Sequence, residues 1–157
     1  MKPLDDIRVL SVTVYLAGPF LSMTLARFGA EVIKVELPNT GDPVRSSGPF
    51  HGPKGINKDR QTEDDLSIRF LKRSEGVKSV TLNLKDPEGL KVFMKLVETA
   101  DVVVENYRPD VKIRLGIDYE SLHTVNPRII LGSISGFGQD GPYVGRPGFD
   151  QIAQGMG

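Results

Sequence analysis

Four polar or cationic side chains come after segments that resemble buried strands, and their chemistry suits a ligand that carries phosphate. Lys85 and the pair Asn106 and Tyr107 each follow a run of branched residues, and Arg114 lies in a short turn or helix further along the chain. Lys and Arg donate to phosphate oxygens, Asn offers an amide, and the face of Tyr can stack on a flat ring. The alternative is that these are ordinary solvated charges and that Tyr107 packs at a rim.

Six residues near the end of the chain, numbers 136–141, have the glycine spacing of a dinucleotide-binding fingerprint. That fingerprint needs a helix to begin at the glycines, so that its first amides face a pyrophosphate. Pro142 and Pro147 follow instead, and no helix is expected before about Phe149. Glu36 ends a strand as a ribose-binding acid would, but the turn after the first strand lacks the glycines of the fingerprint. A dinucleotide oxidoreductase therefore remains a weak alternative.

Neither a metal site nor a nucleophile can be assigned from the sequence. The chain has no cysteine, and its two histidines, His51 and His123, lie far apart without a ligand pattern around them. Ser133 and Ser135 lack the flanking glycines of a nucleophile elbow. We therefore predict no metal and no tightly bound cofactor.

Composition narrows the class of protein. The 157 residues include 20 Lys and Arg against 20 Asp and Glu, so the formal net charge is zero. This balance argues against nucleic-acid binding by bulk charge and against a polybasic membrane surface. No apolar run approaches the roughly 20 residues that a membrane-spanning helix needs. Together with the absent signal-peptide pattern and absent cysteines, this predicts a soluble cytoplasmic protein with one domain.

Strand-like and helix-like segments alternate along the chain. The patterns predict helices that begin near residue 19, at residue 86 and at residue 119, between strands at residues 7–13, 31–36, 78–83, 101–105 and 128–134. Short joints between them favour an α/β fold with a doubly wound, mostly parallel, Rossmann-like sheet. Ligands bind such sheets beyond the carboxyl ends of the strands, which is where the four residues above are expected.

Residues 38–65 interrupt this alternation. Pro and Gly cluster with polar residues there, so the pattern predicts a long loop. Its two interpretations are a mobile excursion, which loop-length statistics favour, and a lid or wall of the site.

Nine segments, taken in order, resemble the N-terminal part of the family III CoA-transferases. That group includes formyl-CoA transferases, carnitine CoA-transferases and the related α-methylacyl-CoA racemases. The motifs Val32-Ile33-Lys34-Val35-Glu36 and Val104-Glu105-Asn106-Tyr107-Arg108 are examples. The segments are residues 4–10, 16–19, 29–36, 79–85, 100–109, 114–116, 126–128, 133–139 and 146–150.

This resemblance implies that residues 1–157 form the N-terminal Rossmann-like CoA-binding domain, incomplete here, of an interlocked homodimer. It implies contacts to CoA along the nucleotide end and the thioester arm. One departure concerns Leu37, which stands where relatives often carry an Arg that contacts a phosphate. The CoA-binding residues carried over by position are Leu16, Ala17, Leu82, Lys85, Asn106, Tyr107, Arg114, Phe149 and Asp150.

The resemblance also implies an activity, namely transfer of CoA between an acyl-CoA and a small carboxylic acid through a carboxylate-bound covalent intermediate. The family's nucleophilic Asp is expected beyond Gly157, so the 157 residues alone are expected to be inactive. The alternatives are a CoA-binding module without catalysis and an acyl-CoA racemase. The racemase is disfavoured because racemases of the superfamily have a His where this chain has Phe149.

Overall fold

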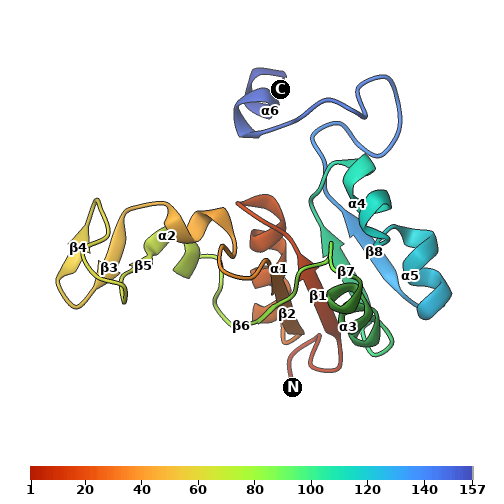
Figure 1. Cartoon of the computed structure of the whole chain (residues 1–157), viewed down its shortest axis with the longest axis horizontal. Coiled ribbons are helices and arrows are strands. Elements are labelled where there is room, and N and C mark those ends of the chain that lie inside the picture. Colours follow the sequence, from red (N-terminus) through yellow and green to blue (C-terminus); the bar gives the residue numbers. More distant parts are fainter. Residues whose placement is uncertain (157) are drawn as a thin grey trace.

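A five-stranded sheet forms the centre of the computed structural model, which describes residues 1–156 (Figure 1). All of its strands run parallel, and their order across the sheet is β6, β2, β1, β7, β8. The strands are β1 (Arg8–Val12), β2 (Glu31–Glu36), β6 (Val77–Thr81), β7 (Val102–Glu105) and β8 (Ile130–Ser133).

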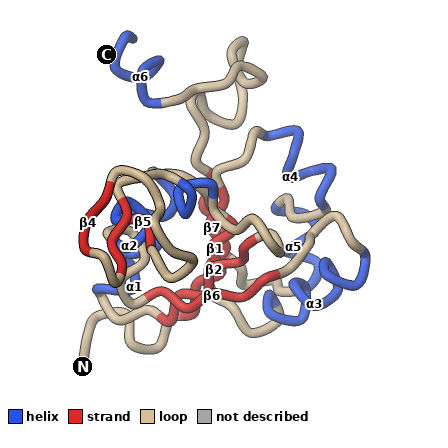
Figure 2. The backbone as a smooth tube through the Cα atoms, turned by 60° about the vertical axis from the view of Figure 1, so that its left-hand side comes forward, coloured by secondary structure: helices blue, strands red, loops and turns tan. Residues whose placement is uncertain are grey.

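The order of the strands reverses between β1 and β7. The chain builds outward from β1 through β2 to β6, and then crosses back to add β7 and β8 on the other side. Helix α1 (Ala17–Arg27) lies on one face of the sheet, and α3 (Pro87–Val97) and α5 (Tyr119–Val125) lie on the other (Figure 2). The predicted doubly wound α/β fold is therefore confirmed, and its crossover point lies between β1 and β7.

The alternation of side chains along β1 explains the two halves of the core. Leu10 and Val12 point to the α3 side, where they join a cluster that includes the fully buried Phe93. Val9 points to the opposite face and packs with Ala26 of α1. Because successive residues of a strand face opposite sides, a central parallel strand must be apolar on both.

Residues 38–65 do not form the predicted long loop. They contain the 3-10 helix η1 (Pro43–Ser46) and the strands β3 (Phe50–Gly52) and β4 (Gly55–Asn57). With β5 (Leu66–Ser67), these strands form a small antiparallel sheet in the order β4, β3, β5. The short helix α2 (Ile68–Leu71) follows β5. Strands of two or three residues carry no visible periodicity, which is why the sequence pattern suggested a loop.

The chain beyond β8 leaves the body of the sheet, and Figure 1 shows it ending in α6 (Asp150–Met156), away from the other helices. Gly136 and Gly148 pack backbone against backbone, since a Cβ on Gly136 would lie 2.4 Å from the Gly148 Cα. No helix follows the glycines of residues 136–141 before α6. The glycine spacing therefore serves a closed loop and does not form a phosphate-binding turn.

The helices of residues 1–156 are short, and none combines the length and apolar character needed to cross a bilayer.

Candidate functional site

A cavity of about 460 Å³ opens at the carboxyl edge of the sheet, meaning the edge where the parallel strands end. Its walls come from the ends of β1 and β2, from the segments after β6 and β7, and from α4 (Pro109–Leu115). Most of the lining is aliphatic, and its polar members lie at the end of β2, after β6 and β7, and on α4. The lining residues are Val12, Val35, Glu36, Leu37, Leu82, Asn83, Leu84, Lys85, Tyr107, Val111, Arg114 and Leu115.

The start of α3 fixes the segment that carries Lys85. Asp86 caps this helix by accepting from the Glu88 amide at 2.9 Å, and Pro87 occupies the first helical position. The Asn83 carboxamide accepts from the Lys85 amide at 3.1 Å. The Lys85 side chain itself is exposed. The backbone of Lys85 is therefore held by Asn83, while its ammonium is free to contact a ligand.

Arg114 reaches the same cavity from α4. Its side chain is 71% exposed, and it forms an ion pair of 3.3 Å with Asp110 one turn earlier. Exposed pairs of this kind contribute little to stability. The guanidinium can therefore turn toward a ligand at small cost.

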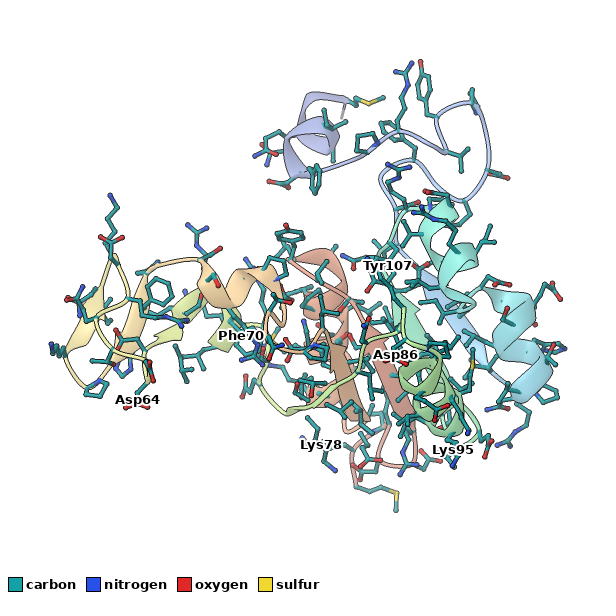
Figure 3. The ribbon with its side chains drawn as sticks, viewed as in Figure 1. Asp64, Phe70, Lys78, Asp86, Lys95 and Tyr107 are labelled. Carbon is teal, nitrogen blue, oxygen red and sulfur yellow. The ribbon has the colours of Figure 1, made fainter. Side chains whose placement is uncertain are left out.

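Tyr107 stands at the carboxyl end of β7, as Figure 3 shows, and lines the cavity from that side. Burial raises the pKa of its phenol, and the charge of Glu105 raises the pKa further. The hydroxyl is therefore protonated at neutral pH. A half-buried neutral ring offers a face and one hydroxyl to a ligand.

A second cavity, of about 620 Å³, adjoins the first. The two share Val35, Glu36, Leu37 and Tyr107, so an extended ligand could occupy both. The remaining walls of the second cavity come from the ends of β1 and β2 and from η1. They are Thr13, Val14, Asn39, Thr40, Gly41, Asp42, Pro43 and Ser46.

Glu36 borders both cavities, but its carboxylate is already paired. Arg45 donates to both oxygens at 2.9 and 2.6 Å, Ser79 donates at 2.6 Å, and the Asp42 amide donates at 2.9 Å. Burial alone would raise the pKa of this carboxyl. The hydrogen bonds outweigh burial and lower the pKa from 4.5 to about 2. Glu36 therefore fastens η1 to the sheet as a permanent anion and is no candidate for a proton-transfer role near neutral pH.

Another buried carboxylate, that of Glu105, lies at the end of β7. It is fully buried and accepts from the Tyr107 amide at 2.7 Å and from the Lys112 ammonium at 3.3 Å. Lys112 also donates to Ser133 at 2.8 Å and to Gln139. This cluster ties α4 and the loop after β8 to the sheet next to Tyr107.

Of the nine residues predicted as CoA contacts, the first cavity brings together Leu82, Lys85, Tyr107 and Arg114. Leu16, Ala17, Asn106, Phe149 and Asp150 line neither cavity.

The five residues outside the cavities have identifiable surroundings. Leu16 is the N-cap of α1, where no side chain caps the helix, and Ala17 begins that helix. The Asn106 amide bonds to the backbone of Val14. Phe149 is 64% exposed with its ring edge-on to Tyr15, and Asp150 begins α6.

Sequence reasoning missed the α4 wall of the cavity, formed by Val111 and Leu115. In the sequence, Val111 and Leu115 are spaced so that they share a helix face with Arg114. That face is known to line the cavity only once α4 is placed against the sheet. Within residues 1–156, no three His, Asp or Glu side chains gather as a metal site.

Comparisons with known proteins find one family for nearly the whole chain. The model of CoA-transferase family III matches residues 4–157. A succinyl-CoA–D-citramalate CoA-transferase of Chloroflexus aurantiacus is 45% identical over 156 residues, covering 99% of this chain and 36% of that protein. A succinyl-CoA:glutarate CoA-transferase of Mus musculus is 43% identical and covered to 33%. An acetyl-CoA:oxalate CoA-transferase of Acetobacter aceti is 42% identical and covered to 36%.

Solved structures give the same picture. A CAIB/BAIF family protein from Brucella suis aligns with a TM-score of 0.84 at 38% identity, over 99% of this chain and 39% of that one. Rv3272 from M. tuberculosis aligns with a TM-score of 0.84 at 35% identity, over 99% and 40%. The chain thus spans a third to two fifths of the length of these relatives.

Proposed function

We propose that this chain, which belongs to CoA-transferase family III, binds the nucleotide end of CoA in the cavity at the carboxyl edge. It does so as the CoA-binding part of an enzyme that moves CoA between an acyl-CoA and a small carboxylic acid. The observation that carries the proposal is the meeting of Leu82, Lys85, Tyr107 and Arg114 around one largely apolar cavity.

The composition of this cavity matches the two parts of a nucleotide. Aliphatic walls and the face of Tyr107 suit a flat base, while Lys85 and Arg114 at the rim suit phosphate oxygens. The chain has no net charge, so a polyanionic ligand must be attracted by local cations. The uncapped amino end of α1 lies at the same edge of the sheet and adds backbone amides and a positive helix dipole.

The relatives support the class of reaction. Their names pair succinyl-CoA or acetyl-CoA with small acids such as glutarate and oxalate. We propose the same class of donor and acceptor here, with a carboxylate-bound covalent intermediate that divides the exchange into two easier steps. Hydroxylamine trapping of an acylated enzyme tests the intermediate.

Binding is tested by calorimetry with CoA on the full-length protein. Arg114→Ala and Lys85→Ala should each remove a charge-assisted contact worth about 1.5–3 kcal/mol, which is about tenfold or more in affinity. Arg128→Ala and Lys95→Ala are matched controls at the opposite edge, where Figure 3 shows Lys95. Equal affinity in all four variants and the wild type would refute the site.

The alternative, a CoA-binding module without catalysis, is tested by an activity assay. An acyl-CoA panel with several carboxylic acids should show CoA exchange by the full-length protein. Tight CoA binding without any exchange would favour the module.

A further inference from the structure

The turn formed by residues 14–16 joins β1 to α1 at the crossover point of the sheet. Its central residue, Tyr15, has a φ of 66°, which lies in the left-handed region. Residues with a large side chain rarely adopt this conformation, and it persists only where surrounding contacts enforce it. The 14–16 turn therefore needs partners that hold it.

Asn106 provides the first of these contacts, from the end of β7. Its Oδ1 accepts from the Val14 amide at 2.9 Å, and its Nδ2 donates to the Val14 carbonyl at 2.8 Å. The carboxamide thus pairs with Val14 as a neighbouring strand would, just beyond the last backbone pair of β1 and β7, Val12 with Glu105.

Asp42 provides the second contact, from the opposite side. One carboxylate oxygen accepts from the Tyr15 amide at 3.1 Å and from the Val44 amide at 3.0 Å. The other accepts from the Lys34 ammonium at 2.5 Å, and both side chains of that pair are at least 96% buried. The buried ion pair with Lys34 holds the Asp42 carboxylate in place, so the acceptor of the Tyr15 amide is fixed in position.

We propose that Asn106 and Asp42 are positioning residues, which jointly hold the 14–16 turn so that the amino end of α1 faces the bound CoA. This inference rests on the proposed function for its ligand. It changes the expected role of Asn106. The side-chain amide that was expected to contact the nucleotide uses one donor and one acceptor in its hydrogen bonds to Val14. Leu16 and Ala17 are then placed by side chains from β7 and from the segment before η1.

The position of the turn explains why holding it matters for binding. Val14 and Asp42 both line the second cavity, and no side chain caps α1, so the turn before the helix helps to orient its first amides. A site needs its contact groups fixed within about 0.5 Å, and a loosened turn would exceed that.

Asn126 offers a matched control for Asn106. It is also an asparagine bonded to backbone, donating to the Val97 and Ala100 carbonyls at 3.0 and 2.8 Å, and it is buried where Asn106 is half-buried. It lies at the opposite edge of the sheet, because Ala100 precedes β7. Asn106→Ala and Asn126→Ala should therefore destabilise the protein to a similar degree, and only Asn106→Ala should affect the turn.

Hydrogen–deuterium exchange on the full-length protein tests the turn directly. Asn106→Ala should raise the exchange rate of the peptide spanning residues 13–18 by about tenfold, which corresponds to the loss of one net hydrogen bond. Asn126→Ala should leave that peptide unchanged. CoA affinity by calorimetry, corrected for the folded fraction, should fall by about tenfold in Asn106→Ala alone.

A pair of double variants separates the bond at Tyr15 from the ion pair. Lys34→Met with Asp42→Asn keeps an acceptor for the Tyr15 amide, whereas Lys34→Met with Asp42→Ala removes it. Both lack the buried charges. The first should retain slow exchange at residues 13–18 and the second should lose it.

Three outcomes would overturn the inference. These are unchanged exchange in Asn106→Ala, an equal rise in Asn126→Ala, and faster exchange with unaltered CoA affinity. Absence of CoA binding by the wild type would refute the proposed function instead, and exchange would then decide alone whether these residues hold the turn.

Discussion

Glu36→Gln is the substitution that best tests how η1 is attached to the main sheet. Gln has nearly the same shape as Glu but carries no charge, and its amide group cannot accept the second hydrogen bond from Arg45. The variant thus removes the anion on which Arg45, Ser79 and the Asp42 amide converge. The Glu36 side chain is 3% exposed, so water cannot replace what is lost.

The size of the effect follows from the pKa of Glu36. A fall in pKa from 4.5 to about 2 corresponds to a preference of about 3 kcal/mol for the ionised form in the folded protein. Because the pKa is lowered on folding, this stabilisation is fully present above pH 4.5 and is lost as the pH falls through the folded value. Glu36→Gln should therefore lower the free energy of unfolding by about 3 kcal/mol at pH 7.

Urea unfolding of wild type and variant in parallel, between pH 7 and pH 2.5, measures this difference. The gap between the two proteins should be constant from pH 7 to about pH 5 and should shrink below pH 4.5. Glu31→Gln is the control, since Glu31 also accepts from two cations, Arg8 and Lys78, but with its side chain 34% exposed. A gap below about 1 kcal/mol at pH 7, or one that does not change with pH, would refute the reasoning.

Three further substitutions test other parts of the structure. Lys112→Met leaves the buried Glu105 without its counter-ion and should cost about 3–5 kcal/mol in urea unfolding; adding Glu105→Gln should recover part of the loss, and no recovery would contradict the pairing. Phe93→Ala should lower the free energy of unfolding by about 3–5 kcal/mol, because Phe93 is fully buried between α3 and the sheet. A decrease below about 1 kcal/mol in urea unfolding would contradict this burial. Gly89→Ala would place a Cβ 2.3 Å from the Asn83 carbonyl oxygen, so it should displace the cavity wall and weaken CoA binding in calorimetry; unchanged affinity would separate that wall from the ligand.

Local chemistry made several elements predictable. The sequence Asp86, Pro87, Glu88 predicts the start of a helix, and α3 begins there with Asp86 as its cap. Runs of branched residues predicted the five parallel strands, most clearly the central strands β1 and β7, because a strand that is covered on both faces must be apolar on both. These signals act within a few residues, so they can be recognised without knowledge of the fold.

Residues 38–65 show where such signals fail. The strand β3 is stabilised by pairing with β4 and with β5, which begins 16 positions after the start of β3. The hydrogen bonds that define these strands join distant residues, and three residues are too few for a period of two to be visible. Glycines and prolines at their turns resemble those of an unstructured loop.

The sequence by itself determined the class of fold and the chemistry available to the site. Lys85 and Tyr107 could be selected because they follow strands, and the ends of parallel strands share one edge of a sheet. Arg114 could be selected because it lies in the short helical segment that comes next in the chain. Only the tertiary structure decided what each side chain does there. Asn106 turned out to bond to Val14, 92 positions away, and the Glu36 carboxylate is paired with the Arg45 guanidinium. Such partners are chosen by packing and burial, because a buried polar group must find its hydrogen bonds among whatever the fold brings within reach.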